Sequence, residues 1–127
     1  MIIYLSKVFS RMARREGLTE VHICKAVAEM NVGLFDANLG AGLFKKRIAI
    51  PGQGKRAGWR SLLGFQKGKK AFFLYLFAKN SCDNIEPDET KALKRLAKYY
   101  LTLEPDEIKA ALQCGELLEV NCIEKET

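Results

Sequence analysis

The spacing of hydrophobic and polar residues changes along this chain, and each spacing predicts a different kind of element. Residues 1–5 are mainly apolar and predict a short strand. In residues 7–16 and 19–33 the apolar positions recur every three or four residues, which is typical of amphipathic helices. Gly17 is placed to end the first helix and Thr19 to cap the second. The N-terminal part therefore predicts a strand followed by a helical hairpin.

The central part of the chain has a period of two, which predicts strands. The first of these has an apolar and a cationic face, formed by Phe44, Ile48 and Ile50 and by Lys45, Arg47 and Ala49. Residues 59–66 repeat the alternation and place Arg60 on the polar side. Residues 71–78 are apolar throughout, as expected of a strand covered on both faces. With a flexible, glycine-rich connection at 51–58 and a turn at 67–70, the pattern predicts a three-stranded antiparallel meander.

Two further helices are expected after the meander. Pro87 and Pro105 each stand at a first helical position and are followed by acidic residues, which the helix dipole favours there. The first helix continues to about Leu101, with an apolar face for the sheet and a basic outer stripe of Lys91, Lys94, Arg95 and Lys98. The second ends near Gly115, and residues 117–120 form either an edge strand or a docking segment.

These elements define an α+β fold. The N-terminal strand and helical hairpin pack on a small antiparallel sheet, the meander, and helices follow at the C-terminus. A length of 127 residues is that of one ordinary domain. We therefore expect a single domain over residues 1–127, in which residues 102–127 are a C-terminal extension without an assigned role.

Charge is concentrated in the predicted meander. The chain has a net charge of +6, yet residues 43–79 contain ten lysines and arginines and no aspartate or glutamate. A cluster of cations without compensating acids is typical of proteins that bind polyanions.

Several other classes of site and location are not expected. His22 is the only histidine and lies apart from any candidate triad, so we expect a solvated or packing role for it. The longest apolar run, residues 71–78, is much shorter than the roughly 20 residues of a membrane span, so no membrane association is expected. The four cysteines lack the paired spacing of a zinc site. We therefore expect reduced, packed thiols at Cys24, Cys82, Cys114 and Cys122, and we expect neither a metal nor a cofactor.

The cationic face of the sheet carries the candidate chemistry. Arginine and lysine side chains bind phosphate oxygens. RNA supplies its own nucleophile, the 2′-hydroxyl, so strand cleavage requires in-line positioning, a proton acceptor and cations around the five-coordinate phosphate. Neighbouring cations lower the pKa of a lysine and allow it to act as a base. The residues alone leave open RNA cleavage, RNA binding without cleavage, and a basic sheet without function.

Three stretches at residues 43–49, 52–60 and 72–80, with the helical hairpin before them and a helix after them, resemble the RelE/ParE superfamily of type II toxin-antitoxin toxins, and its RelE/HigB-like branch in particular. The resemblance implies a cytoplasmic, ribosome-dependent mRNA interferase, a metal-independent endoribonuclease that inhibits translation without a cofactor. It also implies two partners, mRNA on the ribosome and a cognate antitoxin of the helix-turn-helix type. The ParE branch has the same fold but poisons DNA gyrase, and this remains the alternative.

The resemblance also implies which residues act. By position, a catalytic set matches the basic residues of the three meander strands in these toxins and consists of Lys45, Arg47, Arg60 and Lys79. The accompanying RNA-binding set is Lys46, Lys55, Arg56 and Asn80. Asn80 stands where RelE proper has a second basic residue, and the C-terminal tyrosine that stacks on a base in RelE has no clear counterpart in this chain.

Overall fold

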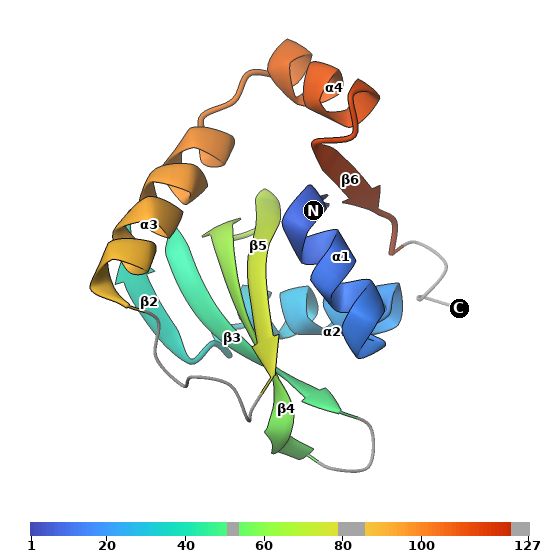
Figure 1. Cartoon of the computed structure of the whole chain (residues 1–127), viewed down its shortest axis with the longest axis vertical. Helices are drawn as coiled ribbons and strands as arrows, with labels where there is room; N and C mark the ends of the chain where they lie inside the picture. Colours follow the sequence, from blue (N-terminus) through green and yellow to red (C-terminus); the bar gives the residue numbers. More distant parts are fainter. Residues whose placement is uncertain (51–53, 79–85, 123–127) are drawn as a thin grey trace.

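The computed structural model describes residues 1–50, 54–78 and 86–122, without the side chains of residues 50, 54–57 and 78. It contains a six-stranded sheet in the order β2-β3-β4-β5-β1-β6 (Figure 1). The strands are β1 (Ile2–Ser6), β2 (Ala37–Gly40), β3 (Leu43–Ile50), β4 (Gly54–Gln66), β5 (Lys70–Ala78) and β6 (Leu117–Val120). The helices are α1 (Lys7–Glu16), α2 (Glu20–Asn31), α3 (Pro87–Leu101) and α4 (Pro105–Gln113). The predicted α+β fold is confirmed.

The sheet is larger than the predicted meander. Strands β3, β4 and β5 form that meander by antiparallel pairing, and the short strand β2 extends it beyond β3. On the other side, β1 pairs in parallel with β5, and β6 pairs antiparallel with β1. Residues 117–120 are therefore an edge strand, so part of the predicted extension belongs to the sheet itself.

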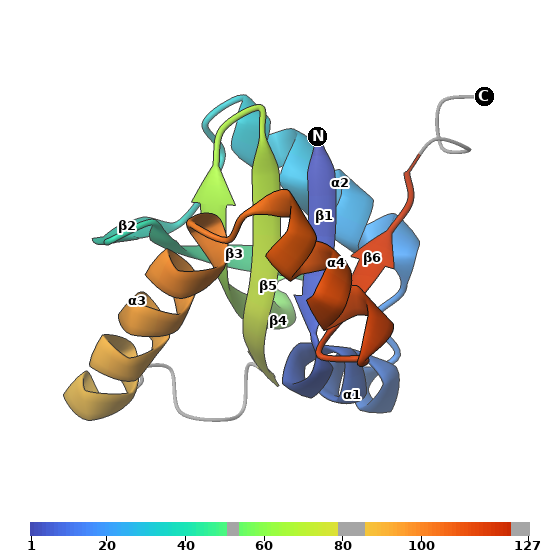
Figure 2. The same ribbon diagram turned by 90° about the horizontal axis from the view of Figure 1, so that it is seen from above.

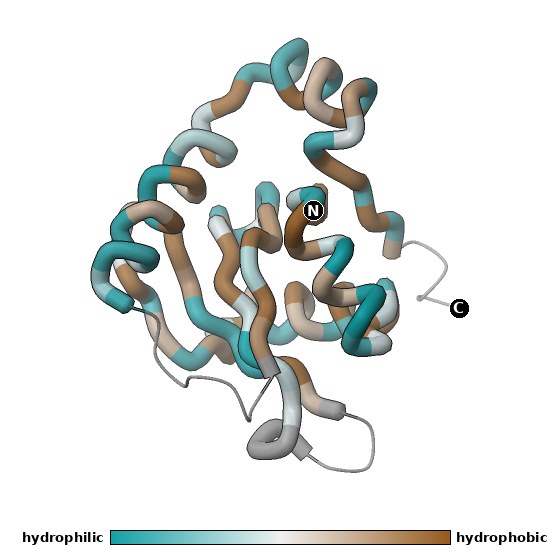
Figure 3. The backbone as a smooth tube through the Cα atoms, viewed as in Figure 1, coloured by the Kyte–Doolittle hydropathy of each residue, from teal (hydrophilic) through white to brown (hydrophobic). Residues whose placement is uncertain are grey.

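Helices cover both faces of the sheet (Figure 2). On one face α1 packs on β1 and β5, and α2 packs on β3, over a cluster of apolar residues that we call the α1/α2 core; it includes Phe9, Ile23, Ile48, Trp59, Leu63 and Phe73. On the other face α3 packs on β3, β4 and β5 over the α3 core, which includes Leu43, Leu62, Phe72, Ala97 and Tyr100. Figure 3 shows the central strands as mainly hydrophobic, while the helices alternate between hydrophobic and hydrophilic residues.

Helix α1 ends at Gly17, as predicted, in the left-handed conformation. Its start is capped by a residue that the sequence did not indicate, Ser6, whose hydroxyl accepts a hydrogen bond from Phe9 N at 3.0 Å. At the start of α2, Thr19 N donates to His22 Nδ1 at 2.9 Å, and the His22 ring lies 5.3 Å from that of Trp59. The expected packing role of His22 is thus confirmed.

One connection differs from the prediction. Residues 54–58 were expected in a flexible loop, but they form the start of β4, with Gly54 opposite Ile50. A Cβ atom on Gly58 would lie 2.0 Å from the Ile48 carbonyl oxygen, where the register of β3 and β4 shifts. The glycine therefore permits a close approach of two backbones, and the stretch that resembles a flexible linker is a strand.

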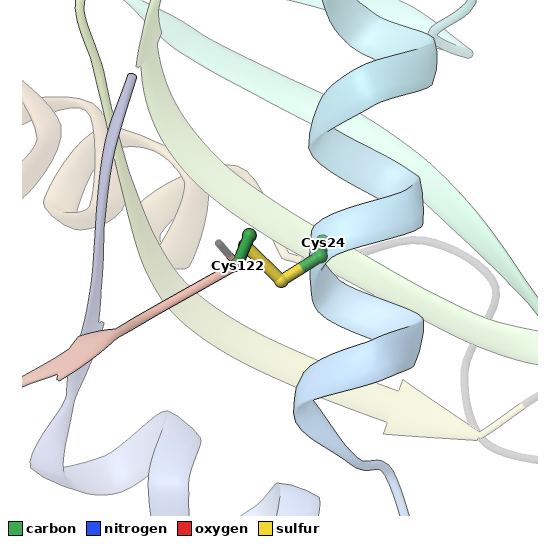
Figure 4. The surroundings of a disulfide bond; sticks show 2 residues. All are labelled: Cys24 and Cys122. Carbon is green, nitrogen blue, oxygen red and sulfur yellow. A yellow bond between two sulfur atoms is a disulfide. The ribbon is translucent and has the colours of Figure 1, made fainter. Parts of the chain in front are cut away.

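The expectation of four reduced thiols is wrong for two of them. Cys24 on α2 and Cys122, which follows β6, form a disulfide with a Cα–Cα distance of 5.9 Å (Figure 4). Cys114 is free and exposed, and Cys82 lies outside the described residues. The sequence separation of 98 hid this pairing, since it requires the residue that follows β6 to lie beside α2. The bond fixes the end of the edge strand to a helix on the α1/α2 face.

Candidate functional site

Three of the predicted catalytic residues lie side by side on the α3 face of the sheet. Lys45 and Arg47 alternate along β3, and Arg60 on β4 lies directly opposite Arg47. Residues opposite each other on antiparallel strands project from the same face. Leu62, two residues after Arg60, belongs to the α3 core, which identifies that face as the one α3 covers in part. The structure thus brings together the cationic face that we now define as Lys45, Arg47 and Arg60.

These three cations differ in exposure. Lys45 is partly exposed, and the side chain of Arg47 is 38% exposed. Arg60 is buried, with only 7% of the residue exposed, and it has an interaction partner within the protein. Lys45 and Arg47 are therefore more accessible to a polyanion than Arg60, which lies deeper on the same face.

Lys46 does not belong to this face. Its side chain is 2% exposed and points to the α1/α2 side, where Nζ donates to Glu29 Oε1 on α2 at 2.6 Å and to the Leu34 carbonyl at 2.8 Å. A lysine in that position cannot reach an RNA phosphate without breaking a buried ion pair. We therefore correct its assignment from RNA contact to internal support of β3.

The remaining predicted site residues are placed less fully. Lys55 and Arg56 belong to β4, and their side chains are not described. Lys79 and Asn80 lie outside the described residues. The basic stripe of α3 faces away from the α3 core: Lys91, Arg95 and Lys98 are exposed and Lys94 is partly exposed, as predicted.

Two aromatic residues lie beside the cationic face. Phe77 is directly opposite Arg60 on β5, and Tyr75 is opposite Leu62. Both are half-buried against the α3 core, with ring centroids 6.2 Å apart. Leu74 is an extra residue on β5, since Leu62 pairs with Tyr75 while Leu63 pairs with Phe73. This bulge turns Tyr75 to the α3 face, which simple alternation could not show.

Asp36 is the residue that the sequence reasoning missed. It precedes β2, outside the acid-free block, and its Oδ2 accepts a hydrogen bond from the backbone N–H of Arg47. Its Oδ1 lies 3.8 Å from Arg47 Nε. No local sequence signal links residue 36 to residue 47, because their contact depends on the pairing of β2 with β3.

In the described part of the chain, no group of three histidine, cysteine, aspartate or glutamate residues has an arrangement that could hold a metal ion. None of the described helices combines the length and the apolar character that crossing a bilayer requires.

The sequence resemblance implied a basic sheet surface that includes Lys45, Arg47 and Arg60, and the structure places these three residues on one face. A family model described as the RelE toxin of the RelE/RelB toxin-antitoxin system matches residues 1–120. No curated protein matches the chain. The chain belongs to the RelE toxin family, and it is a toxin of a toxin-antitoxin system with an antitoxin as its partner. The match includes β6, which was expected to lie in an extension.

Proposed function

We propose that the protein is a ribosome-dependent mRNA interferase of the RelE/HigB type, acting in the cytoplasm as an endoribonuclease. The observation that carries this proposal is the row of Lys45, Arg47 and Arg60 on one face of the sheet. Like charges directly opposite on neighbouring strands disfavour pairing. Arg47 and Arg60 occupy such positions, and a bound phosphate would offset the repulsion between them.

The proposed reaction needs only groups that RNA and this face supply. The 2′-oxygen attacks the adjacent phosphorus while the bond to the 5′-oxygen breaks, which leaves a 2′,3′-cyclic phosphate and a free 5′-hydroxyl. The proton of the 2′-hydroxyl passes to a base, and the leaving 5′-oxygen receives a proton. Cations at the phosphate stabilise the charge of the five-coordinate transition state. We assign this stabilisation to Arg47 and Arg60, and phosphate contact or proton acceptance to Lys45 and Lys79.

The ribosome has a part in this proposal because a single-stranded message must be held in line for attack. Aromatic side chains stack on the bases of single strands. Phe77 and Tyr75 lie next to the cationic face and are suited to such a contact. For the antitoxin we propose a helix-turn-helix protein whose acidic or helical segments cover the cationic face, since this would neutralise the toxin by excluding RNA.

The test compares equal losses of charge on the two faces of the sheet. Lys45→Ala/Arg47→Ala removes two cations from the cationic face, and Arg11→Ala/Arg14→Ala removes two exposed cations from α1 on the other side. Each variant is induced in cells with and without the antitoxin, and mRNA ends are mapped. We expect cuts within translated codons and growth arrest from the wild type and the α1 variant, and neither from the sheet variant.

A binding measurement sharpens the same comparison. Each lost phosphate contact to a single strand lowers the slope of log affinity against log salt by about 0.7. The magnitude of this slope should therefore be smaller by about 1.4 in the sheet variant and unchanged in the α1 variant. Transcript cleavage that persists in the sheet variant would contradict the proposed site. Intact transcripts with trapped gyrase–DNA complexes would indicate a ParE-like poison, and RNA binding without cuts would indicate a non-catalytic RNA-binding protein.

A further inference from the structure

The segment before β2 is fastened to three consecutive residues of β3. Its three bonds run from Lys46 Nζ to the Leu34 carbonyl at 2.8 Å, from Asp36 N to the Lys45 carbonyl at 2.9 Å, and from Arg47 N to Asp36 Oδ2. Next to them, the Phe35 and Phe44 rings form a T-shaped pair with centroids 4.9 Å apart. Residues 34–36 therefore form a support along the strand that carries Lys45 and Arg47.

The support ends in a carboxylate that faces Arg47. One oxygen of Asp36 is held by the backbone of Arg47, which turns the other towards Nε of the same residue, 3.8 Å away. That distance is too long for a hydrogen bond, and Nε is buried without a hydrogen-bond partner within the described structure. The side chain as a whole remains 38% exposed. The Nε side of the guanidinium is thus turned inward, although the side chain as a whole reaches the surface.

We propose that Asp36 is a positioning residue that orients the Arg47 guanidinium for a phosphate of the RNA. A guanidinium is planar and offers its N–H groups in a fixed fork, so a carboxylate on the Nε side leaves the terminal nitrogens for the substrate. The inference rests on the proposed function of the cationic face. It adds an acidic residue to a site otherwise made of cations.

The position of the carboxylate also predicts that its removal affects RNA binding and the rate of cleavage differently. A negative charge beside Arg47 weakens the general attraction of RNA, because it offsets one cation. It improves the reaction only by holding the guanidinium in the geometry that the transition state requires. Removal of this charge should therefore lower kcat without raising KM, whereas removal of Arg47 itself should impair both.

The kinetic test uses full-length protein, programmed ribosomes and a defined mRNA. Asp36→Asn keeps an oxygen that can accept from Arg47 N–H but removes the charge, and Asp106→Asn makes the same charge change at an exposed position on α4. We expect kcat to fall about tenfold for Asp36→Asn with KM unchanged or lower, in line with the sensitivity of such reactions to misplacement. Asp36→Ala, which also loses the acceptor, should fall further. A kcat for Asp36→Asn equal to that of Asp106→Asn would overturn the proposal.

A second readout does not depend on cleavage. In ¹⁵N NMR spectra the Arg47 Nε–H signal, assigned by its loss in Arg47→Lys, should shift and exchange faster with water in Asp36→Asn but not in Asp106→Asn. Addition of a single-stranded RNA oligonucleotide should move this signal in the wild type and much less in Asp36→Asn. An Arg47 signal unaffected by Asp36→Asn would overturn the positioning role. A wild type that binds the oligonucleotide but cuts no mRNA would instead contradict the proposed function, while the NMR comparison still decides on Asp36.

Discussion

Basic side chains are buried and paired on one face of the sheet and partly exposed on the other. On the α1/α2 face the lysine of β3, Lys46, is enclosed and paired with Glu29 at 2.6 Å. On the α3 face the same strand presents Lys45 and Arg47, both partly exposed, next to Arg60. One face is covered by α1 and α2. The other is covered by α3, which packs where Gly64 lies under Ala97, and by α4, whose Ala111 is buried in the same α3 core. The uncovered remainder of the second face is where a polyanion can bind.

The contrast shows that adjacent residues of one type can have unrelated roles. Lys45 and Lys46 differ by one position, and the pleat of the strand sends them to opposite faces. A buried lysine is tolerated when it is paired and hydrogen-bonded, and Lys46 satisfies both conditions. A count of basic residues therefore overstates the size of the RNA-binding surface.

The largest expected effect compares an aromatic residue on each face. Phe73 is fully buried in the α1/α2 core, whereas Phe77 is half-buried beside Arg60. Phe73→Ala should cost about 4 kcal/mol of unfolding free energy, as is usual for a fully buried phenylalanine, and Phe77→Ala about half as much. Urea denaturation of both variants measures the difference. Equal losses of unfolding free energy would mean that the two side chains are equally buried, which would contradict the difference between the two faces.

An intermediate effect is expected from the disulfide on the α1/α2 face. Reduction of Cys24–Cys122 should lower the free energy of unfolding by about 3 kcal/mol, because the bond closes a long loop in the unfolded chain. Cys24→Ser/Cys122→Ser should match the reduced wild type and be insensitive to dithiothreitol. Cys114→Ser, which changes a free and exposed cysteine, serves as the control and should keep the full response to reductant. A wild type whose thermal unfolding ignores dithiothreitol would show that this tie is dispensable.

The smallest effect concerns Tyr100 in the α3 core. Its hydroxyl donates to Glu116 Oε2 at 2.9 Å, and burial, followed by this bond, raises the pKa of the phenol above its ordinary value. The folded state thus favours the neutral phenol, and its stabilising contribution is lost as the pH rises above about 10. Tyr100→Phe should cost about 1 kcal/mol at neutral pH and reduce the loss of stability above pH 10. Urea midpoints measured from pH 7 to 11 provide the check. Burial also raises the pKa of Tyr4, so part of the alkaline loss should remain; a loss as steep as that of the wild type would contradict the role given to Tyr100.

Local patterns predicted most of the elements of this fold. Strong signals lie next to the residues they affect: Gly17 ends α1, Thr19 starts α2, and Pro87 and Pro105 begin α3 and α4. The alternation along β3 and β4 placed Lys45, Arg47 and Arg60 on one face. What local patterns missed was long-range: the short strand β2, the parallel pairing of β1 with β5, and the early start of β4 at Gly54.

The residues of the candidate site also separate into those that local patterns predicted and those that depend on long-range contacts. Its three described cations came from periodicity and from resemblance, since both depend on order along the chain. Asp36 and the burial of Lys46 depend on which segments lie beside β3, and no spacing between residues 29, 36 and 46 encodes that. The disulfide between Cys24 and Cys122 is a further case, because two single cysteines give no sign of being neighbours.

By itself, then, the sequence determined that ten cations without an acid lie in and around a meander, that alternate residues of its strands share a face, and that the chain resembles a family of toxins. Only the tertiary structure decided which of those cations are accessible. A side chain's exposure depends on what packs over it: α2 and Glu29 enclose Lys46, while α3 leaves Lys45 and Arg47 partly exposed. The acid that reaches Arg47 comes instead from the segment before β2, because strand pairing brings residues together across any distance in the chain.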